Sequence, residues 1–248
     1  MKQRLCVISG TGMESLAEEF SFQELFPIRS DTPWGQVPLI HLSSGDVDLF
    51  LIDRHHTKFE DKRNPPHNIN HRANIYAAAS LNPSLIISVN SVGSMLEEFP
   101  PGSVGIVGDV LDLFSPPITF HEEDAVHVDR TRCFSEAYIQ KIVASKQNLG
   151  HITSGIIVAQ TSGPQFESPS EILALKAMGA HAVGMTLGPE SRLIREKNIP
   201  HVALCCSSNW AAGLTPGDPS TPIKHDQVSN QADAIKSKVA SCIASLIR

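Results

Sequence analysis

The chain has 248 residues and a formal charge of −6, from 20 basic and 26 acidic side chains. This length can bury a sizeable core, and an acidic balance without a basic run argues against a nucleic-acid partner. The five cysteines are odd in number and lack a C-x-x-C spacing, which argues against a disulfide framework or a zinc knuckle and favours the cytoplasm. The apolar run after Lys2 and Arg4 is too short for a signal peptide, and no stretch approaches the length of a membrane span.

Short apolar runs recur along the chain and predict buried strands. They cover residues 5–8, 47–52, 85–89, 104–107, 155–158, 182–185 and 202–206. Helical patterns lie between or after them at residues 70–80, 169–178, 189–197 and 227–247. Strands interleaved with helices predict an α/β fold whose parallel or mixed sheet is covered on both faces. No linker or shift in composition divides the chain, so we expect one domain over residues 1–248.

Two of the predicted strands end in residues suited to an anion. The first ends in a loop with the sequence Ser9-Gly10-Thr11-Gly12, where glycines allow close approach and the hydroxyl can meet an oxyanion, although a plain tight turn explains it better when taken alone. The loop lacks the third glycine of a dinucleotide fingerprint, which disfavours a dehydrogenase. The strand at residues 47–52 leads to Arg54 and His55, a plausible phosphate clamp or, equally, a surface Arg near a His.

Further polar residues follow the strands at residues 85–89 and 202–206, which we expect to end there. Ser91 and Asn209 would then lie beyond strand ends, where ligands bind in open α/β sheets. An Asn offers a donor and an acceptor on a short stem, although satisfying local backbone is the simpler interpretation of Asn209. Four histidines lie between residues 55 and 71, but no accompanying carboxylate makes a metal-binding pattern, so we expect no metal.

A capping box is predicted at the start of the helix at residues 169–178. Ser168 is the expected N-cap, Pro169 the first helical residue and Glu171 the reciprocal partner. This assignment gives no structural task to Phe166 and Glu167, which stand directly before the cap. An aromatic side chain beside a carboxylate in this position favours a role in ligand binding.

Taken together, the motifs resemble the trimeric purine nucleoside phosphorylases, in particular the methylthioadenosine/methylthioinosine phosphorylase branch. The resemblance covers nearly the whole chain in the family's order: SGTG (9–12), TPWG (32–35), RH (54–55), NHRAN (70–74), NSVGS (90–94), PG (101–102), GPQFE (163–167), GMT (184–186), PE (189–190) and SN (208–209). It implies a single-domain α/β fold, with a mixed sheet and a partial barrel flanked by helices, and a homotrimer. It also implies phosphate-dependent cleavage of a purine nucleoside to free base and ribose 1-phosphate, with phosphate as co-substrate and no cofactor.

The resemblance also implies roles for individual residues. The expected phosphate site consists of Thr11, Arg54, His55, Ser91 and Thr186. The expected base site consists of Val92, Gly93, Phe166, Glu167 and Asn209. On the ribose and 5′ side we expect Met185, His127 lent by a neighbouring subunit, and His225. Asn209, as the donor near N7 of the leaving purine, and His55 are the expected catalytic residues.

The substrate follows from the base-site pair. An ionised Glu167 accepts from N1–H of a 6-oxopurine and Asn209 donates toward O6 and N7, whereas methylthioadenosine enzymes usually carry Asp at the position of Asn209. We therefore expect an inosine or guanosine type of substrate. S-methyl-5′-thioinosine (or 5′-methylthioadenosine) is the alternative, because residues 65–67 and 211–213 resemble that branch while His225 resembles the ordinary phosphorylases. A non-catalytic nucleoside-binding protein is the alternative of another class. The chain departs from the family at Ser9, at His56 and over the charged residues 57–64.

Overall fold

The computed structural model describes residues 2–57, 62–145, 152–223 and 232–247. Its strands are β1 (Gln3–Ser9), β2 (Glu24–Thr32), β3 (Gly35–Ser44), β4 (Val47–Asp53), β5 (Leu85–Ser94), β6 (Val104–Leu111), β7 (Thr153–Gln160), β8 (Ala182–Gly184) and β9 (His201–Trp210). Its helices are α1 (His71–Ser80), α2 (Glu136–Ala144), α4 (Pro169–Ala177), α5 (Leu187–Glu196) and α7 (Ala232–Ala244), with short 3-10 turns at Leu16–Glu19 and Pro66–Asn68. The strands form one sheet in the order β2-β3-β4-β1-β5-β8-β7-β6-β9.

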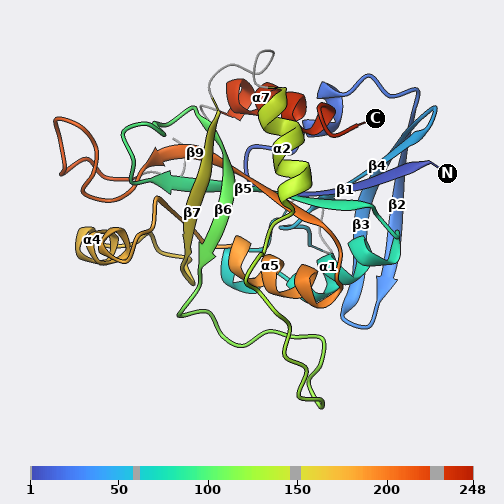
Figure 1. The fold of residues 1–248 in the computed structure, drawn as a ribbon, viewed down its shortest axis with the longest axis horizontal. Helices are drawn as coiled ribbons and strands as arrows, with labels where there is room; N and C mark the ends of the chain where they lie inside the picture. The colour runs from blue at the N-terminus through green and yellow to red at the C-terminus, as the bar shows by residue number, and fades with distance from the viewer. Residues whose placement is uncertain (1, 58–61, 146–151, 224–231, 248) are drawn as a thin grey trace.

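Helices cover both faces of this sheet (Figure 1). Successive residues of β1 belong to the cores on opposite faces. Leu5 and Val7 pack into the core beneath α2 and α7, whereas Cys6 and Ile8 pack into the core beneath α1 and α5. Because both faces are buried, the central strands are apolar along continuous runs, which is the pattern read from the sequence. The expected mixed sheet flanked by helices is confirmed.

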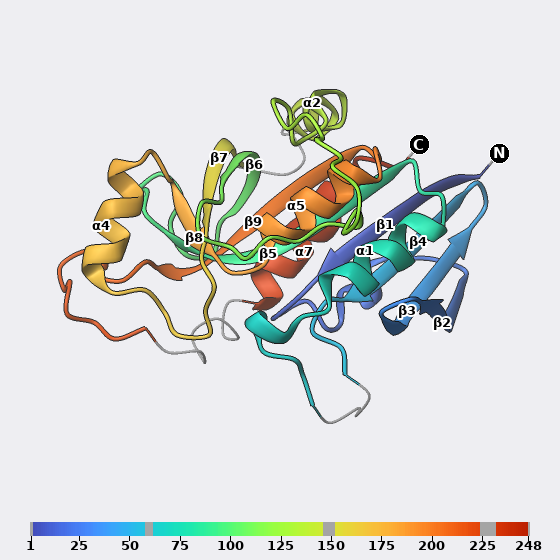
Figure 2. The ribbon, with the colours of Figure 1, turned by 90° about the horizontal axis from the view of Figure 1, so that it is seen from below.

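One half of the sheet closes into a barrel. β5 and β9 pair in parallel, and the neighbours β5-β8-β7-β6-β9 lead back to the same pair. Figure 2 shows this half next to α4, with β1 to β4 on the opposite side of the molecule. The barrel implied by the family resemblance is confirmed.

The strand ends expected after residues 89 and 206 are wrong. β5 continues to Ser94 and β9 continues to Trp210, so the polar residues lie within paired strands. They are tolerated because the barrel supplies partners: the hydroxyl of Ser208 donates to the carbonyl of Val92 at 3.2 Å. Ser208 is also the unpaired residue of a bulge in the β5–β9 register, directly before Asn209. A bulge of this kind re-aims the neighbouring side chains.

The predicted helices are present, with small differences at their ends. Asn70 caps α1 by accepting from the backbone N–H of Ala73, and Ser168 caps α4 in the expected capping box with Glu171. α5 begins at Leu187, two residues before the expected start, because the first turn of a helix accepts a proline. α7 lies within the expected residues 227–247.

The β2–β3 hairpin and α2 were not predicted. β2 is an edge strand that is exposed over most of its length and contains Pro27, so it shows neither alternation nor an apolar run. α2 is a nine-residue helix that fully buries only Ile142. In the part of the chain that the structure describes, no helix has the length and apolar character needed to cross a membrane.

Candidate active site

A cavity of about 520 Å³ lies where the carboxyl ends of β1, β4, β5 and β9 meet. This is the edge of an α/β sheet at which ligands bind. Most of the site residues expected from the sequence line it, although they come from distant parts of the chain: Thr11, Arg54, His55, Ser91, Val92, Gly93, Phe166, Glu167, Met185, Thr186 and Asn209. The structure therefore brings the expected phosphate and base residues to one place.

Arg54 is buried beside this cavity, with 2% of its surface exposed. Its guanidinium donates to both carboxylate oxygens of Glu190, at 2.6 and 3.3 Å, and to the carbonyls of Val89 and Ile8, at 2.7 and 2.9 Å. Burial alone would raise the pKa of the Glu190 carboxyl, but the charge of Arg54 holds that pKa below its usual value. The two charges offset each other, and four of the five N–H groups of Arg54 are used within the protein.

His55 is oriented by two hydrogen bonds. Its Nδ1 donates to the carbonyl of Asn64 at 2.7 Å, and its backbone N–H donates to the carboxylate of Asp53 at 3.0 Å. Burial, followed by the charge of Arg54, lowers the pKa of His55, so the ring is neutral near pH 7. Because Nδ1 carries the proton, Nε2 has a lone pair with which to accept a proton from a ligand hydroxyl.

The glycine loop after β1 allows these side chains to approach it. A Cβ on Gly10 would lie 2.5 Å from Nη1 of Arg54 and 3.1 Å from Nε2 of His55, so no larger residue fits without a shift. The hydroxyl of Ser91 donates to the carbonyl of Thr11 at 3.2 Å and ties the loop to β5. The loop is therefore a structural turn that also presents Thr11 to the cavity.

Thr186 stands at the N-terminus of α5 and is also buried. Its hydroxyl oxygen accepts from the side-chain amide of Asn90 at 2.8 Å, which leaves the hydroxyl hydrogen to donate to a ligand. The dipole of α5 adds partial positive charge at the same point. We call this part of the cavity, formed by Thr11, Arg54, His55, Ser91 and Thr186, the anion end.

Asn209 is held in place within β9. Its side-chain amide donates to the carbonyl of Trp210 at 2.8 Å, and its amide oxygen lies 2.8 Å from the hydroxyl of Ser208, whose single hydrogen it shares with the carbonyl of Val92. One amide N–H is left for a ligand. Gly93 makes room for it, since a Cβ there would lie 3.2 Å from Nδ2 of Asn209. Asn209 thus bonds to local backbone, as the simpler interpretation expected, and lines the cavity as well.

The loop before α4 supplies Phe166 and Glu167. Phe166 is 41% exposed, and the carboxylate of Glu167 accepts from the hydroxyl of Thr161 at 2.6 Å. The contact with Thr161 gives Glu167 a structural task that the sequence did not predict. We call Asn209, Phe166 and Glu167 the base end of the cavity. Met185 lies close to the same loop, since a Cβ on Gly163 would meet its sulfur.

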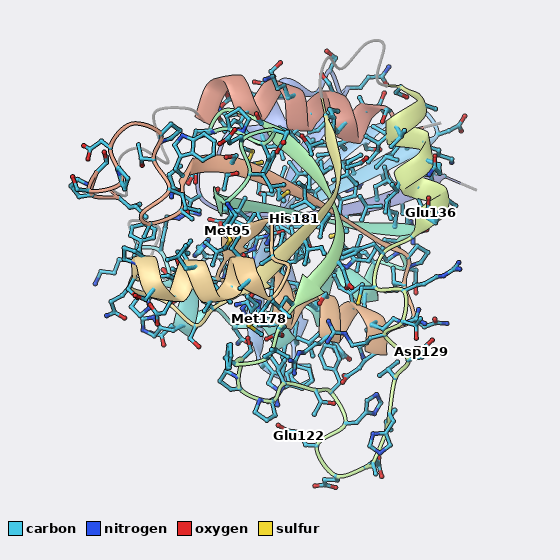
Figure 3. The ribbon with its side chains drawn as sticks, turned by 60° about the vertical axis from the view of Figure 1, so that its left-hand side comes forward. Met95, Glu122, Asp129, Glu136, Met178 and His181 are labelled. Atoms are coloured by element: carbon cyan, nitrogen blue, oxygen red, sulfur yellow. The ribbon has the colours of Figure 1, made fainter. Side chains whose placement is uncertain are left out.

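Of the two histidines expected on the 5′ side, the structure describes His127. His127 is exposed on the segment between β6 and α2, which projects away from the body of the molecule in Figure 1. Figure 3 labels Glu122 and Asp129 on either side of it along the same segment. His127 therefore does not line the cavity of its own chain. His225 lies outside the described residues.

Sequence reasoning missed two charged residues that line the cavity, Glu14 and Arg63. Arg63 donates to Glu14 at 3.0 Å and to Asp53 at 2.9 Å. A signal for Arg63 was present, because the charged residues 57–64 depart from the family. Pro65, Pro66 and Ala211, which carried the resemblance to the methylthioinosine branch, line the same cavity.

Comparisons with known proteins agree with the fold and the motifs. The family model of the phosphorylase superfamily matches residues 4–248. A probable S-methyl-5′-thioinosine phosphorylase of Methanothermobacter thermautotrophicus is 33% identical over 98% of this chain and 82% of the relative. The 6-oxopurine nucleoside phosphorylase of Pyrococcus furiosus is 31% identical over 86% of this chain and 81% of the relative.

A methylthioadenosine phosphorylase of Schistosoma mansoni, solved in complex with adenine, shares the fold. It superposes with a TM-score of 0.85 at 21% identity and covers 99% of this chain and 90% of that one. The fold, the ordered motifs and the relatives all agree, and the chain therefore belongs to the phosphorylase superfamily.

Proposed function

We propose that the protein cleaves a 6-oxopurine nucleoside, of the inosine or guanosine type, with inorganic phosphate to give the free purine and ribose 1-phosphate. One observation carries this proposal: a single cavity holds an anion end and a base end. Each end alone would suit many binding proteins. A nucleoside phosphorylase needs both, because phosphate and nucleoside must meet at C1′ of the sugar.

The cavity suggests how the reaction proceeds. An oxygen of hydrogen phosphate bonds to C1′ while the bond from C1′ to N9 of the purine breaks. The proton that phosphate gives up balances the proton that the departing purine gains. Nε2 of His55 is the proposed acceptor of the phosphate proton, which it then releases to solvent. The unused amide N–H of Asn209 is the proposed hydrogen-bond donor to N7, and the departing purine takes its proton from solvent. A preorganised donor aimed at developing charge contributes roughly 10²–10³-fold in rate. Phosphate is the only co-substrate in this scheme, and no cofactor takes part.

The base end supports the preference for a 6-oxopurine. An ionised Glu167 accepts from N1–H of such a base, whereas adenine would place a lone pair against it. Asn209 supplies a donor for O6 or N7. The preference matches the names of relatives that are 6-oxopurine or S-methyl-5′-thioinosine phosphorylases.

S-methyl-5′-thioinosine is the second candidate substrate. Pro65, Pro66, Ala211 and Ile223 give the cavity an apolar part suited to a methylthio group. The same base would be read by Glu167 and Asn209, so the two candidates differ only at the 5′ position.

We further propose that the enzyme works as a homotrimer in the cytoplasm. The projecting segment exposes His127 together with Leu113, Phe114 and Val126, apolar side chains that a neighbouring subunit would cover. In such an assembly His127 would reach the 5′ end of the nucleoside bound next door. The five cysteines form no disulfide bonds, in keeping with a reducing compartment.

A substrate panel tests the function. Inosine, guanosine, S-methyl-5′-thioinosine and 5′-methylthioadenosine are each incubated with the protein, with and without phosphate, and the free base is measured by chromatography. We expect phosphate-dependent release from the 6-oxopurine nucleosides and much slower release of adenine. Tight nucleoside binding without release of base in the presence of phosphate would instead support the non-catalytic nucleoside-binding protein.

A further inference from the structure

The anion end has an unusual balance of charge for a site that takes a dianion. Among the described residues that line the cavity, Arg54 and Arg63 are the permanent cations, and Glu14 and Glu167 are the carboxylates. The positive charge of Arg54 is offset by the carboxylate of Glu190, and one of its N–H groups has no partner among the residues that the structure describes and can donate to a ligand. Arg54 therefore cannot hold a phosphate dianion by a two-pronged contact of its guanidinium.

Arg63 is the other cation, and it is placed differently. It lines this cavity and a neighbouring one of about 1170 Å³ that lies against β2 and β3. Its side chain is 37% exposed, compared with 2% for Arg54. Its charge contributes to lowering the pKa of His55, after burial and the charge of Arg54. Arg63 is thus near the imidazole of the anion end while its guanidinium remains accessible.

Glu14 occupies donors that an incoming anion could use. Its Oε1 accepts from the backbone N–H of Gly12 at 3.3 Å and from Nη1 of Arg63 at 3.0 Å. Gly12 has a φ of 83°, in the left-handed region, within the loop that presents Thr11 to the cavity. A backbone N–H of the loop and a guanidinium thus donate to the same carboxylate oxygen. A phosphate oxygen in that position would accept from the same two donors.

We propose that Arg63 is a second cationic ligand of phosphate, and that the Glu14 carboxylate holds its place until phosphate displaces it. This inference rests on the proposed function for the identity of the anion. The contact between Arg63 and Glu14 is solvent-exposed, and such ion pairs contribute only about 0–1 kcal/mol, so it is readily exchanged. Asp53 keeps Arg63 at the cavity wall during the exchange, because it binds the other terminal nitrogen, Nη2.

Opposite charge-neutralising variants distinguish this role from a structural one. Arg63→Gln removes a charged donor to phosphate, which should raise the phosphate KM about tenfold with kcat little changed. Glu14→Gln removes the competing charge, which should lower the phosphate KM about threefold. A purely structural ion pair would be broken in both variants, so both would move the KM in the same direction.

Phosphate-induced thermal stabilisation gives a second readout that needs no turnover. A ligand that binds the folded state stabilises it by RT ln(1 + c/Kd), where c is the ligand concentration, so the Tm shift at a fixed phosphate concentration should shrink in Arg63→Gln and grow in Glu14→Gln. Arg63→Lys, which keeps the charge, should fall between wild type and Arg63→Gln. Arg4→Gln is the matched control, since Arg4 is exposed, pairs with Asp48 and lies near the start of β1, at the opposite end of that strand from the glycine loop.

The outcomes separate the inference from the function. Wild-type protein that phosphate stabilises but that releases no base from any nucleoside would refute the proposed function, and the Tm shifts of the variants would still decide the role of Arg63. Equal shifts in both variants, or changes below about twofold, would overturn the role of Arg63 even in an active enzyme.

Discussion

The two ends of the cavity are built in different ways. At the anion end, Arg54 and Glu190 are 2% and 0% exposed and are bonded to each other in the core. At the base end, Phe166 is 41% exposed, and Glu167 sits on the loop before α4 with a hydroxyl as its partner. The anion end is therefore part of what holds the fold together, whereas two of the three base-end residues lie on the loop before α4 and only Asn209 is buried in the sheet, within β9.

Substitutions at a buried position and substitutions on a loop should therefore have different effects. Phosphate is common to every phosphorolysis, so its donors can be fixed in the core, where they need not reorganise during the reaction. The base differs between substrates, and loop residues can change without disturbing the core. We expect substitutions of Arg54 and Glu190 to change stability as well as activity, and substitutions of the loop residues Phe166 and Glu167 to change mainly specificity.

The largest effect is expected for Arg54→Ala. Removing the guanidinium leaves the Glu190 carboxylate buried without its partner, which should lower the free energy of unfolding by about 3–5 kcal/mol in a urea titration. The phosphate KM should rise as well. The double variant Arg54→Met with Glu190→Leu should recover much of the stability, because no unpaired charge remains. A loss of less than about 1 kcal/mol in the single variant would contradict the view that this pair belongs to the core.

The next effect concerns pH, through His71 beside the same pair. Burial lowers the pKa of His71 from 6.5 to about 4. Between these values the unfolded chain binds a proton that the folded chain does not, so stability falls as the pH is lowered from 6.5 to 4. At about 1.4 kcal/mol per pKa unit, the loss approaches 3 kcal/mol. His201, whose pKa burial also lowers to about 4, adds a loss of the same sign.

Urea titrations at pH 7 and at pH 4.5 measure this dependence. His71→Gln should weaken it, because glutamine does not titrate, and the exposed His67→Gln should leave it as in the wild type. An equal change in the free energy of unfolding between pH 7 and pH 4.5 in all three proteins would show that His71 does not contribute to the pH dependence.

The smallest of these effects, and the one that sharpens the contrast, is expected for Asn209→Asp. A carboxylate accepts where the amide donated, which mismatches O6 of inosine and matches the amino group of adenine. A mismatched buried hydrogen bond costs about 1–3 kcal/mol, so the ratio of kcat/KM for inosine over adenosine should fall roughly 10–100-fold. Asn198→Asp, on the surface, is the control for the added charge. An unchanged ratio would remove Asn209 from base recognition.

Local signals predicted much of this molecule. Continuous apolar runs identified the central strands because both faces of the sheet are buried, and the capping box at Ser168 and Glu171 fixed the start of α4. The hairpin escaped prediction because β2 is exposed and contains Pro27, which leaves no periodic pattern. The ends of β5 and β9 were misplaced because serine and asparagine look like loop residues until the barrel supplies their partners.

For the site too, residues that are neighbours in the sequence could be predicted and contacts between distant residues could not. Arg54 and His55 could be picked out next to each other in the sequence, but the pairing of Arg54 with Glu190 joins residues 136 positions apart. Because of that pairing, Arg54 is a core residue whose hydrogen-bond donors are mostly used within the protein, and not a free anion clamp. Arg63 and Glu14 belong to none of the motifs, and their contact joins segments far apart in the sequence, one after β1 and one after β4.

The central claim is that phosphate, and not water, is the nucleophile that attacks C1′ of the sugar and displaces the purine. Inosine and phosphate can be followed together with wild-type protein, with hypoxanthine measured by absorbance and phosphorus species by ³¹P NMR. We predict one ribose 1-phosphate formed and one phosphate consumed for each hypoxanthine released. Hypoxanthine released with free ribose, at a rate independent of phosphate, would contradict the account.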